Sequence, residues 1–231
     1  MKCLILASGF GTRMYPLTLN YAKALLPYKS KAMINHIVDK IPQEIEILVN
    51  VNKKFEADFV EWQRQQRRKI TLCVENVHSE KEMLGAVGAL NYWIENKDIK
   101  EDLLLFGSDN YFEFDLSSFI AAFNGKNALI AVYDVGDPSK ATQYGVVKLK
   151  GRRIIELEEK PANPKSSLIS TACWVLPSKV FPIIAEFCRG TKRDNLGNFI
   201  AYLSARDEVY AYPFKETWMD IGSLEIYHAT K

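Results

Sequence analysis

The chain opens on MKCLILASGFGTRM (residues 1–14), an apolar run followed at once by a glycine-rich turn. The run over residues 2–7 predicts a buried strand, because it is short, continuous and bounded by turn residues. The turn over residues 8–13 has glycine at two positions and ends on Arg13. Ligands of open parallel sheets bind beyond the carboxyl ends of the strands. The turn is therefore the first place to look for a ligand site.

The glycine turn has the chemistry of a phosphate-binding loop. Gly9 and Gly11 permit positive φ angles and close backbone approach, so successive N–H groups can point at a phosphate. Arg13 adds a planar donor fork that suits phosphate oxygens. Met14 stands where the dinucleotide fingerprint has its third glycine, and no GKS or GKT follows as in a Walker A loop. A nicotinamide dehydrogenase is therefore disfavoured.

Strand and helix patterns alternate downstream of the turn. Strands are predicted at 44–51, 70–75, 103–107, 128–135, 144–149, 153–158, 168–176 and 208–214. Helices are predicted at 31–41, 53–66, 84–96, 116–124, 178–188 and 195–205, with Asp115 as an N-cap. Alternating strands and helices in the first half predict a mainly parallel sheet with helices on both faces. We expect one α/β domain over residues 1–231, Rossmann-like, with a mixed central sheet and a β-rich lobe.

Composition excludes several classes of protein. Hydrophobic residues make up 48% of the 231 residues and charged residues 25%, as in ordinary folded globular proteins. Thirty basic and 28 acidic residues leave a net charge of +2, too small to favour nucleic acid or a membrane surface as partner. No run of about 18 apolar residues is present, so no membrane span is predicted. The four cysteines form no CxxC pair and are predicted to be buried thiols of a reducing, cytoplasmic compartment.

The glycine turn belongs to a longer series of motifs that runs along most of the chain. The motifs are GFGTRMYPLT (9–18) with Lys23 and Leu26-Pro27, GSDN (107–110), YGVV (144–147), EEKP (158–161) and WMDIGS (218–223). In this order they resemble the motifs of the sugar nucleotidylyltransferases, the pyrophosphorylase family that includes glucose-1-phosphate thymidylyltransferase. The resemblance implies a nucleotide-binding half over about 1–125 and an acceptor-binding half, with the β-rich sugar-binding lobe, over about 126–231.

The resemblance also implies a reaction. The family transfers a nucleoside monophosphate from a nucleoside triphosphate to a sugar 1-phosphate, with Mg²⁺, and releases an NDP-sugar and pyrophosphate. Such a step needs positioning and charge neutralisation more than covalent chemistry from the protein. The resemblance gives catalytic roles to Arg13 on the triphosphate, Lys23 near the α-phosphate and Lys160 on the sugar phosphate. It makes Asp109 and Asp220 the magnesium ligands, which agrees with the preference of Mg²⁺ for one or two carboxylates plus phosphate oxygens.

The same resemblance assigns the residues that contact the substrates. The nucleotide-binding residues it implies are Leu6, Gly9, Gly11, Thr12, Glu75 and Gly85. The acceptor-binding residues it implies are Asn110, Tyr144, Gly145, Glu159 and Trp218. Among these, Glu159 is expected to accept hydrogen bonds from sugar hydroxyls.

The chain departs from the family pattern at four places. Ser108 and Ala172 stand where glycine is usual, and 193–198 replaces a segment that commonly carries a glutamate contacting the sugar. Glu75 stands where users of pyrimidine bases often carry glutamine. A glutamine amide both donates and accepts, as uracil and thymine require, whereas a carboxylate only accepts and suits the N–H groups of guanine. These departures leave the acceptor and the base open.

The expected substrates are dTTP or UTP and a hexose 1-phosphate such as glucose 1-phosphate. The alternative is GTP or CTP, or a phosphorylated acceptor that is not a sugar. A further hypothesis, outside the enzymes, is a non-catalytic protein that binds nucleotide-sugars. The chain ends eight residues after Ser223, so we expect a catalytic core without a regulatory or acyltransferase module. Relatives are often dimers or tetramers, and a homo-oligomer is among the expectations.

Overall fold

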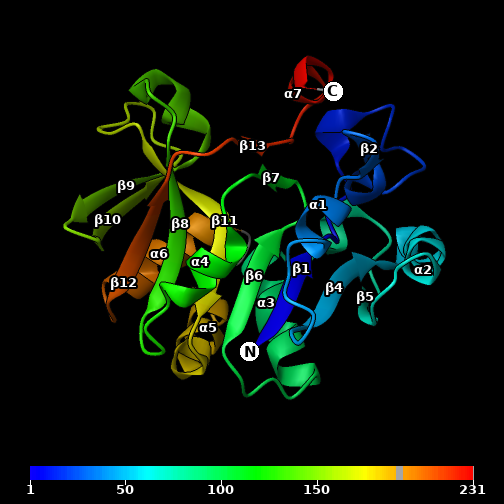
Figure 1. The fold of residues 1–231 in the computed structure, drawn as a ribbon, viewed down its shortest axis with the longest axis horizontal. Coiled ribbons are helices and arrows are strands. Elements are labelled where there is room, and N and C mark those ends of the chain that lie inside the picture. The colour runs from blue at the N-terminus through cyan, green and yellow to red at the C-terminus, as the bar shows by residue number, and fades with distance from the viewer. Residues whose placement is uncertain (191–194, 231) are drawn as a thin grey trace. The chain divides into compact units, whose positions relative to one another are not determined.

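The computed structural model describes residues 1–190 and 195–230 (Figure 1). Its strands are β1 Lys2–Leu6, β2 Pro27–Tyr28, β3 Lys31–Ala32, β4 Glu46–Asn52, β5 Ile70–Glu75, β6 Leu103–Gly107, β7 Asn110–Phe112, β8 Ala128–Asp134, β9 Gly145–Lys150, β10 Arg153–Glu159, β11 Leu168–Leu176, β12 Val209–Phe214 and β13 Trp218–Asp220. Its α-helices are α1 Asn35–Val38, α2 Glu56–Arg64, α3 Ala86–Asn96, α4 Leu116–Ala121, α5 Phe181–Cys188, α6 Leu196–Ser204 and α7 Leu224–Thr230. The predicted mixed α/β fold, with a central sheet flanked by helices, is confirmed.

Two compact units divide the chain. The first comprises residues 1–83, 106–113 and the segment from Thr217 onward, and the second comprises 84–105 and 114–216. Strand β6, all of whose residues are buried, contributes residues to both units. These compact units do not coincide with the predicted nucleotide-binding half (1–125) and acceptor-binding half (126–231). That functional division remains a prediction.

The first unit is built on parallel strands in the order β5-β4-β1 (Figure 1). Leu4 of β1 pairs with Leu48 of β4, which pairs in turn with Thr71 of β5. Strand β1 is buried along its centre, as the continuous apolar run predicts. A short antiparallel pair joins β7 to β13 in the same unit. Parallel strands end at one edge, and here that edge carries the glycine turn.

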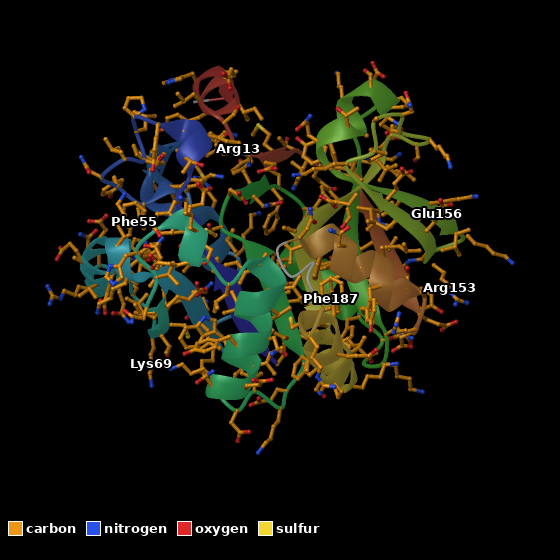
Figure 2. The ribbon with its side chains drawn as sticks, turned by 180° about the vertical axis from the view of Figure 1, so that it is seen from behind. Arg13, Phe55, Lys69, Arg153, Glu156 and Phe187 are labelled. Atoms are coloured by element: carbon orange, nitrogen blue, oxygen red, sulfur yellow. The ribbon has the colours of Figure 1, made fainter. Side chains whose placement is uncertain are left out.

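The second unit contains a mixed sheet in the order β11-β8-β12-β10-β9. Strand β12 runs parallel to β8, and the other pairs are antiparallel. Helices α5 and α6 lie on the face of this sheet that is turned to the viewer in Figure 2. Phe187 of α5 packs there with its ring centroid 5.5 Å from Phe199 of α6. This is the β-rich lobe that the second half of the sequence predicts.

Local signals define most element boundaries. The Asp115 carboxylate accepts hydrogen bonds from the backbone N–H groups of Ser117 and Ser118, so the predicted N-cap of α4 is confirmed. The predicted helix over 31–41 is wrong in extent, because its first residues form β3 and the α-helix covers only Asn35–Val38. The hairpin turn before β3 takes positive φ at Lys29 and Ser30, and Pro42 disfavours continuation of the helix.

Three further observations bear on the predictions from composition. Among the described residues, no helix has both the length and the apolar character needed to cross a membrane. The cysteines are free thiols; Cys3, Cys73 and Cys173 are buried as predicted, whereas Cys188 is only half-buried. Burial raises the pKa of the Cys3 thiol far above its ordinary range, so this thiol is an inert core group.

Candidate active site

In the glycine turn, Gly11 lies against Thr18 and Lys23, which follow it by 7 and 12 positions in the sequence. Gly11 has φ of +64° and precedes a single 3₁₀ turn over Thr12–Met14. A side chain at Gly11 would place its Cβ 3.1 Å from Cγ2 of Thr18 and 3.2 Å from Cβ of Lys23. The Thr18 hydroxyl donates to the Gly11 carbonyl oxygen at 2.7 Å. The motif spacing therefore reflects a packed unit in which glycine, threonine and lysine touch.

Arg13 lies on the 3₁₀ turn and is exposed (Figure 2). Its Nη2 would lie 3.2 Å from a Cβ built on Gly222, and Oδ1 of Asp220 would lie 3.3 Å from the same point. Gly222 therefore leaves the space in which the guanidinium of Arg13 and the carboxylate of Asp220 approach each other. The first and last motifs of the chain meet here, within the first unit.

Asp109 follows β6 and is paired with Lys23. The Lys23 Nζ atom lies 2.8 Å from Oδ2 of Asp109, and the two side chains are 12% and 30% exposed. The Asn110 amide donates to Oδ1 of Asp109 at 3.0 Å. Burial raises the pKa of the Asp109 carboxyl, but the Lys23 charge and these hydrogen bonds outweigh burial and hold the pKa below its ordinary value. Asp109 is thus an ionised group, ready to bind a cation.

The second predicted metal ligand lies on the neighbouring strand. In the antiparallel pair β7–β13, Asp220 is opposite Asn110, and the Ile221 N–H donates to the Asp109 carbonyl oxygen at 2.9 Å. Oδ1 of Asp220 is buried. Within the described part of the chain, no group of three or more His, Cys, Asp or Glu side chains could hold a metal ion. Two carboxylates fit Mg²⁺, which takes its remaining ligands from phosphates and water.

Asn110 and Trp218 support this arrangement. The Trp218 indole N–H donates to Oδ1 of Asn110 at 2.9 Å, and both residues are buried. The Asn110 amide thus accepts from Trp218 and donates to Asp109, which orients the carboxylate. Contact of Asn110 and Trp218 with the acceptor remains a prediction.

Glu75 ends β5 and is 3% exposed. Burial raises the pKa of its carboxyl, and hydrogen bonds with Asn50 and Ser8 partly oppose that effect. Oε1 of Glu75 makes no hydrogen bond with the described residues. Asn50 also donates to the Ser8 hydroxyl at 3.0 Å, so buried polar groups gather at the carboxyl ends of β1, β4 and β5. A buried oxygen without a hydrogen-bond partner is costly, so contact of Glu75 with a polar ligand remains a prediction.

The remaining predicted nucleotide-side residues are placed as follows. Leu6 ends β1, and its carbonyl oxygen accepts from the Ser108 N–H at 3.0 Å. The Thr12 hydroxyl donates to Glu80 at 3.1 Å. No described atom lies within 4 Å of a Cβ built on Gly9, whose backbone is therefore open to a ligand. Gly85 has φ of +76° and is the N-cap of α3, in the second unit.

The second unit contains Tyr144, Gly145 and Glu159 of the predicted acceptor-binding residues, together with Lys160. Glu159, at the end of β10, is opposite Gly145, the first residue of β9. The Lys160 N–H donates to the Tyr144 carbonyl oxygen at 2.9 Å. Lys160 has φ of +47°, a strained value for a residue other than glycine, and such strain concentrates at functional sites. Glu159, Lys160, Tyr144 and Gly145 therefore lie together, and their contact with the acceptor remains a prediction.

Some residues of these clusters had no role in the sequence analysis. Thr18, Asn50 and Gly197 lie against predicted site residues through side-chain hydrogen bonds or close packing. Asn195 appears there only within a segment that departs from the family pattern. The sequence does offer a signal for Asn50, because a polar residue near the end of an apolar strand can mark a binding site at that edge of the sheet. Arg193 and Asp194 of the departing segment lie outside the described residues.

Comparisons with known proteins give a family match over almost the whole chain. Residues 2–231 match the family model described as "Nucleotidyl transferase". A protein of Sulfolobus acidocaldarius named "Putative mannose-1-phosphate guanyltransferase" is 28% identical over 96% of this chain and 60% of its own length. The "Bifunctional protein GlmU" of Methanocaldococcus jannaschii is 28% identical over 96% of this chain and 51% of its own length. The chain thus spans between half and two thirds of these curated relatives.

A solved structure is similar over the whole chain. The crystal structure of a "Putative Glucose-1-Phosphate Thymidylyltransferase" from Bacillus anthracis, in complex with a sucrose, superposes with a TM-score of 0.85. Its sequence is 28% identical, and the alignment covers 100% of this chain and 93% of that one. The fold is therefore shared with a protein whose name describes transfer of a nucleotide to a sugar phosphate.

Proposed function

Because the chain belongs to the nucleotidyl transferase family, and a relative is named for guanylyl transfer to mannose 1-phosphate, we propose that it transfers a nucleoside monophosphate from a triphosphate to a hexose 1-phosphate. The observation that carries the proposal is the cluster around Asp109 in the first unit. Lys23 lies 2.8 Å from Asp109, and Asp220 lies on the adjoining strand beside Arg13. Carboxylates that can hold a metal ion and cationic side chains that neutralise phosphate charge are groups that phosphoryl transfer uses.

The chemistry follows from the charges of these groups. An oxygen of the sugar phosphate attacks the α-phosphorus, the bond from that phosphorus to the bridging oxygen breaks, and pyrophosphate leaves with the electron pair. Arg13 holds the triphosphate and stabilises the charge that develops on pyrophosphate, and Lys23 binds at the α-phosphate. Lys160 binds and orients the attacking phosphate. Asp109 and Asp220 would hold Mg²⁺, which supplies charge neutralisation at the phosphates.

The base is proposed from the motifs. The YGVV segment and the Asp109-Asn110 pair resemble those of thymidylyl- and uridylyltransferases and support dTTP or UTP, with glucose 1-phosphate as acceptor. The similarity to a structure named for thymidylyl transfer adds to this support.

A specific observation favours a second candidate base. The buried carboxylate of Glu75, with Oε1 lacking a hydrogen bond to the described residues, suits the N1–H and N2–H₂ donors of guanine. The Sulfolobus acidocaldarius relative is named a putative mannose-1-phosphate guanyltransferase. GTP is therefore the alternative triphosphate.

The test is magnesium-dependent release of pyrophosphate over a matrix of ATP, GTP, CTP, UTP and dTTP against several hexose 1-phosphates. Release with one base and one sugar supports the proposal and identifies both substrates. If GTP is the substrate, Glu75→Gln should shift the preference toward UTP or dTTP. A preference for a pyrimidine in the unmodified protein would contradict the guanine candidate. No release from a folded protein, even with phosphorylated alcohols as acceptors, would favour a non-catalytic protein.

A further inference from the structure

Asn195 bridges helix α6 to the end of β10. Its Oδ1 accepts a hydrogen bond from the Gly197 N–H at 2.9 Å, which caps α6. Its Nδ2 donates to Oε1 of Glu159 at 2.7 Å. The cap needs an oxygen and the carboxylate needs a donor, so only one orientation of the amide satisfies both partners. A single side chain therefore couples the start of a helix to a predicted acceptor-binding carboxylate.

Two glycines leave the space that the Glu159 carboxylate occupies. Oε2 of Glu159 would lie 1.8 Å from a Cβ built on Gly197 and 3.0 Å from one built on Gly145. No real side chain tolerates the first distance, so any residue other than glycine at position 197 would displace the carboxylate. Glu159 is half-buried, and its carboxylate is thus confined on two sides by backbone and oriented on a third by Asn195.

Position 195 carries a neutral amide, which can donate a hydrogen bond to the Glu159 carboxylate without repelling it. A carboxylate at position 195 would stand within hydrogen-bond distance of the Glu159 carboxylate. Two carboxylates so close repel each other, so a carboxylate at position 195 could not hold Glu159 in place. Asn195 instead donates to the charged form, which leaves Glu159 able to accept hydrogen bonds.

We infer that Asn195 is a positioning residue that, together with Gly145 and Gly197, holds the Glu159 carboxylate against the hydroxyl groups of the acceptor. The inference rests on the proposed function, in which Glu159 binds the acceptor. It deepens that function by naming the acceptor class. An ionised carboxylate only accepts, so the acceptor must present a hydroxyl donor to Glu159 in addition to its phosphate.

Two variants test the inference from opposite sides. Asn195→Ser keeps a good helix cap but removes the amide donor. Gly197→Ala introduces a better helix former while displacing the carboxylate. Each variant should raise the KM for the acceptor about 10-fold, the effect of losing one hydrogen bond to a charged group. The KM for the triphosphate should stay unchanged, and the melting temperature of Gly197→Ala should not fall.

A double-mutant cycle separates positioning from a merely structural role. Asn195→Ser should have no further effect on the acceptor KM when Glu159 is already alanine, because there is no carboxylate left to position. Asn195→Ser should also reduce discrimination between the hexose 1-phosphate and its monodeoxy analogues. Additive effects in the cycle, or an equal rise in both KM values, would overturn the inference.

Failure of the inference differs from failure of the proposed function. If the unmodified protein transfers the nucleotide and Asn195→Ser has an unchanged acceptor KM, only the inference fails. If the unmodified protein releases no pyrophosphate, the proposed function fails. Hexose 1-phosphate is then titrated by calorimetry into the unmodified protein and into Asn195→Ser, and weaker binding to the variant is expected. Equal affinities, or no binding to either protein, would refute the inference.

Discussion

At the scale of single residues, the site consists of a few charged groups whose surroundings define their roles. The Lys23–Asp109 pair is partly buried, and loss of one partner would leave the other charge without its main counterpart. Glu75 and Glu159 are both carboxylates near substrate-binding motifs. They differ because Glu75 is buried with a raised pKa, whereas Glu159 is half-buried and oriented by an amide.

Asp220, at the end of β13, is expected to act as a metal ligand rather than as a structural group. Asp220→Asn should lower kcat by about 10²–10³, because it removes one charge that holds the metal at the phosphates. The melting temperature should change little. The measurement is kcat for pyrophosphate release, with the exposed helix-capping Asp137→Asn as control. Equal rates for Asp220→Asn and the unmodified protein would remove Asp220 from the site.

Lys160 is expected to serve the acceptor. Lys160→Ala should raise the KM for the sugar 1-phosphate about 10- to 100-fold, since it removes a charged donor from the acceptor phosphate. Lys148 on β9 is an exposed lysine of the same unit, and Lys148→Ala is the matched control. Steady-state kinetics with each substrate varied in turn would check this. A rise in the triphosphate KM alone would show that the role given to Lys160 is wrong.

The buried Glu75 carboxylate is expected to lower the stability of the folded protein at neutral pH. Burial raises the pKa of its carboxyl in the folded protein, so the folded state binds a proton more tightly than the unfolded state. The folded state therefore loses stability as pH rises through the folded pKa. Glu75→Gln should have a higher melting temperature at pH 7, and the difference should shrink as pH falls below the ordinary glutamate range. A difference independent of pH would show that titration is not the cause.

At the scale of elements, strand ends and helix starts carry the chemistry. The carboxyl ends of β1, β4 and β5 bear the glycine turn, Asn50 and Glu75, and the β7–β13 pair places Asp109 beside Asp220. Helix starts contribute through capping, where one side chain can serve both a helix and a site, as Asn195 does.

Asp115 caps α4 and is not among the predicted site residues, so its variants test the structural effect of a cap. Its carboxylate accepts from two backbone N–H groups at the start of α4. Asp115→Ala should destabilise the protein by about 1 kcal/mol and lower the melting temperature by about 2–4 °C. The KM values should remain unchanged. Asp115→Asn keeps a capping group and should be nearly neutral; an equal loss for both variants would contradict the capping role.

At the scale of the whole molecule, the metal is expected to belong to the reaction and not to the fold. Within residues 1–190 and 195–230, no cluster of three or more metal-ligating acidic, histidine or cysteine side chains occurs. EDTA should therefore abolish pyrophosphate release but leave the melting temperature of the nucleotide-free protein unchanged. Mg²⁺ added back should restore the rate. A fall in melting temperature with EDTA would instead indicate a structural metal.

The sequence by itself determined what depends on local pattern. The apolar run of β1, the glycine turn with Gly11 at positive φ, and the Asp115 cap are set by neighbouring residues, and they lie where the pattern predicts them. The motifs identified the family for the same reason, since each is a short run of residues. Helix α1 is shorter than its pattern predicts, because the β2–β3 hairpin takes up the first residues.

Only the tertiary structure decided which distant residues meet. Asp109 joins Lys23 across 86 positions, and the amide of Asn195 reaches Glu159 across 36 positions. Asp220 stands beside Asn110 because β13 pairs with β7. Such contacts depend on strand register and on where a loop returns the chain, and no local pattern encodes either. Burial of Glu75 is likewise a property of the packed sheet, because the same residue in an open loop would keep an ordinary pKa.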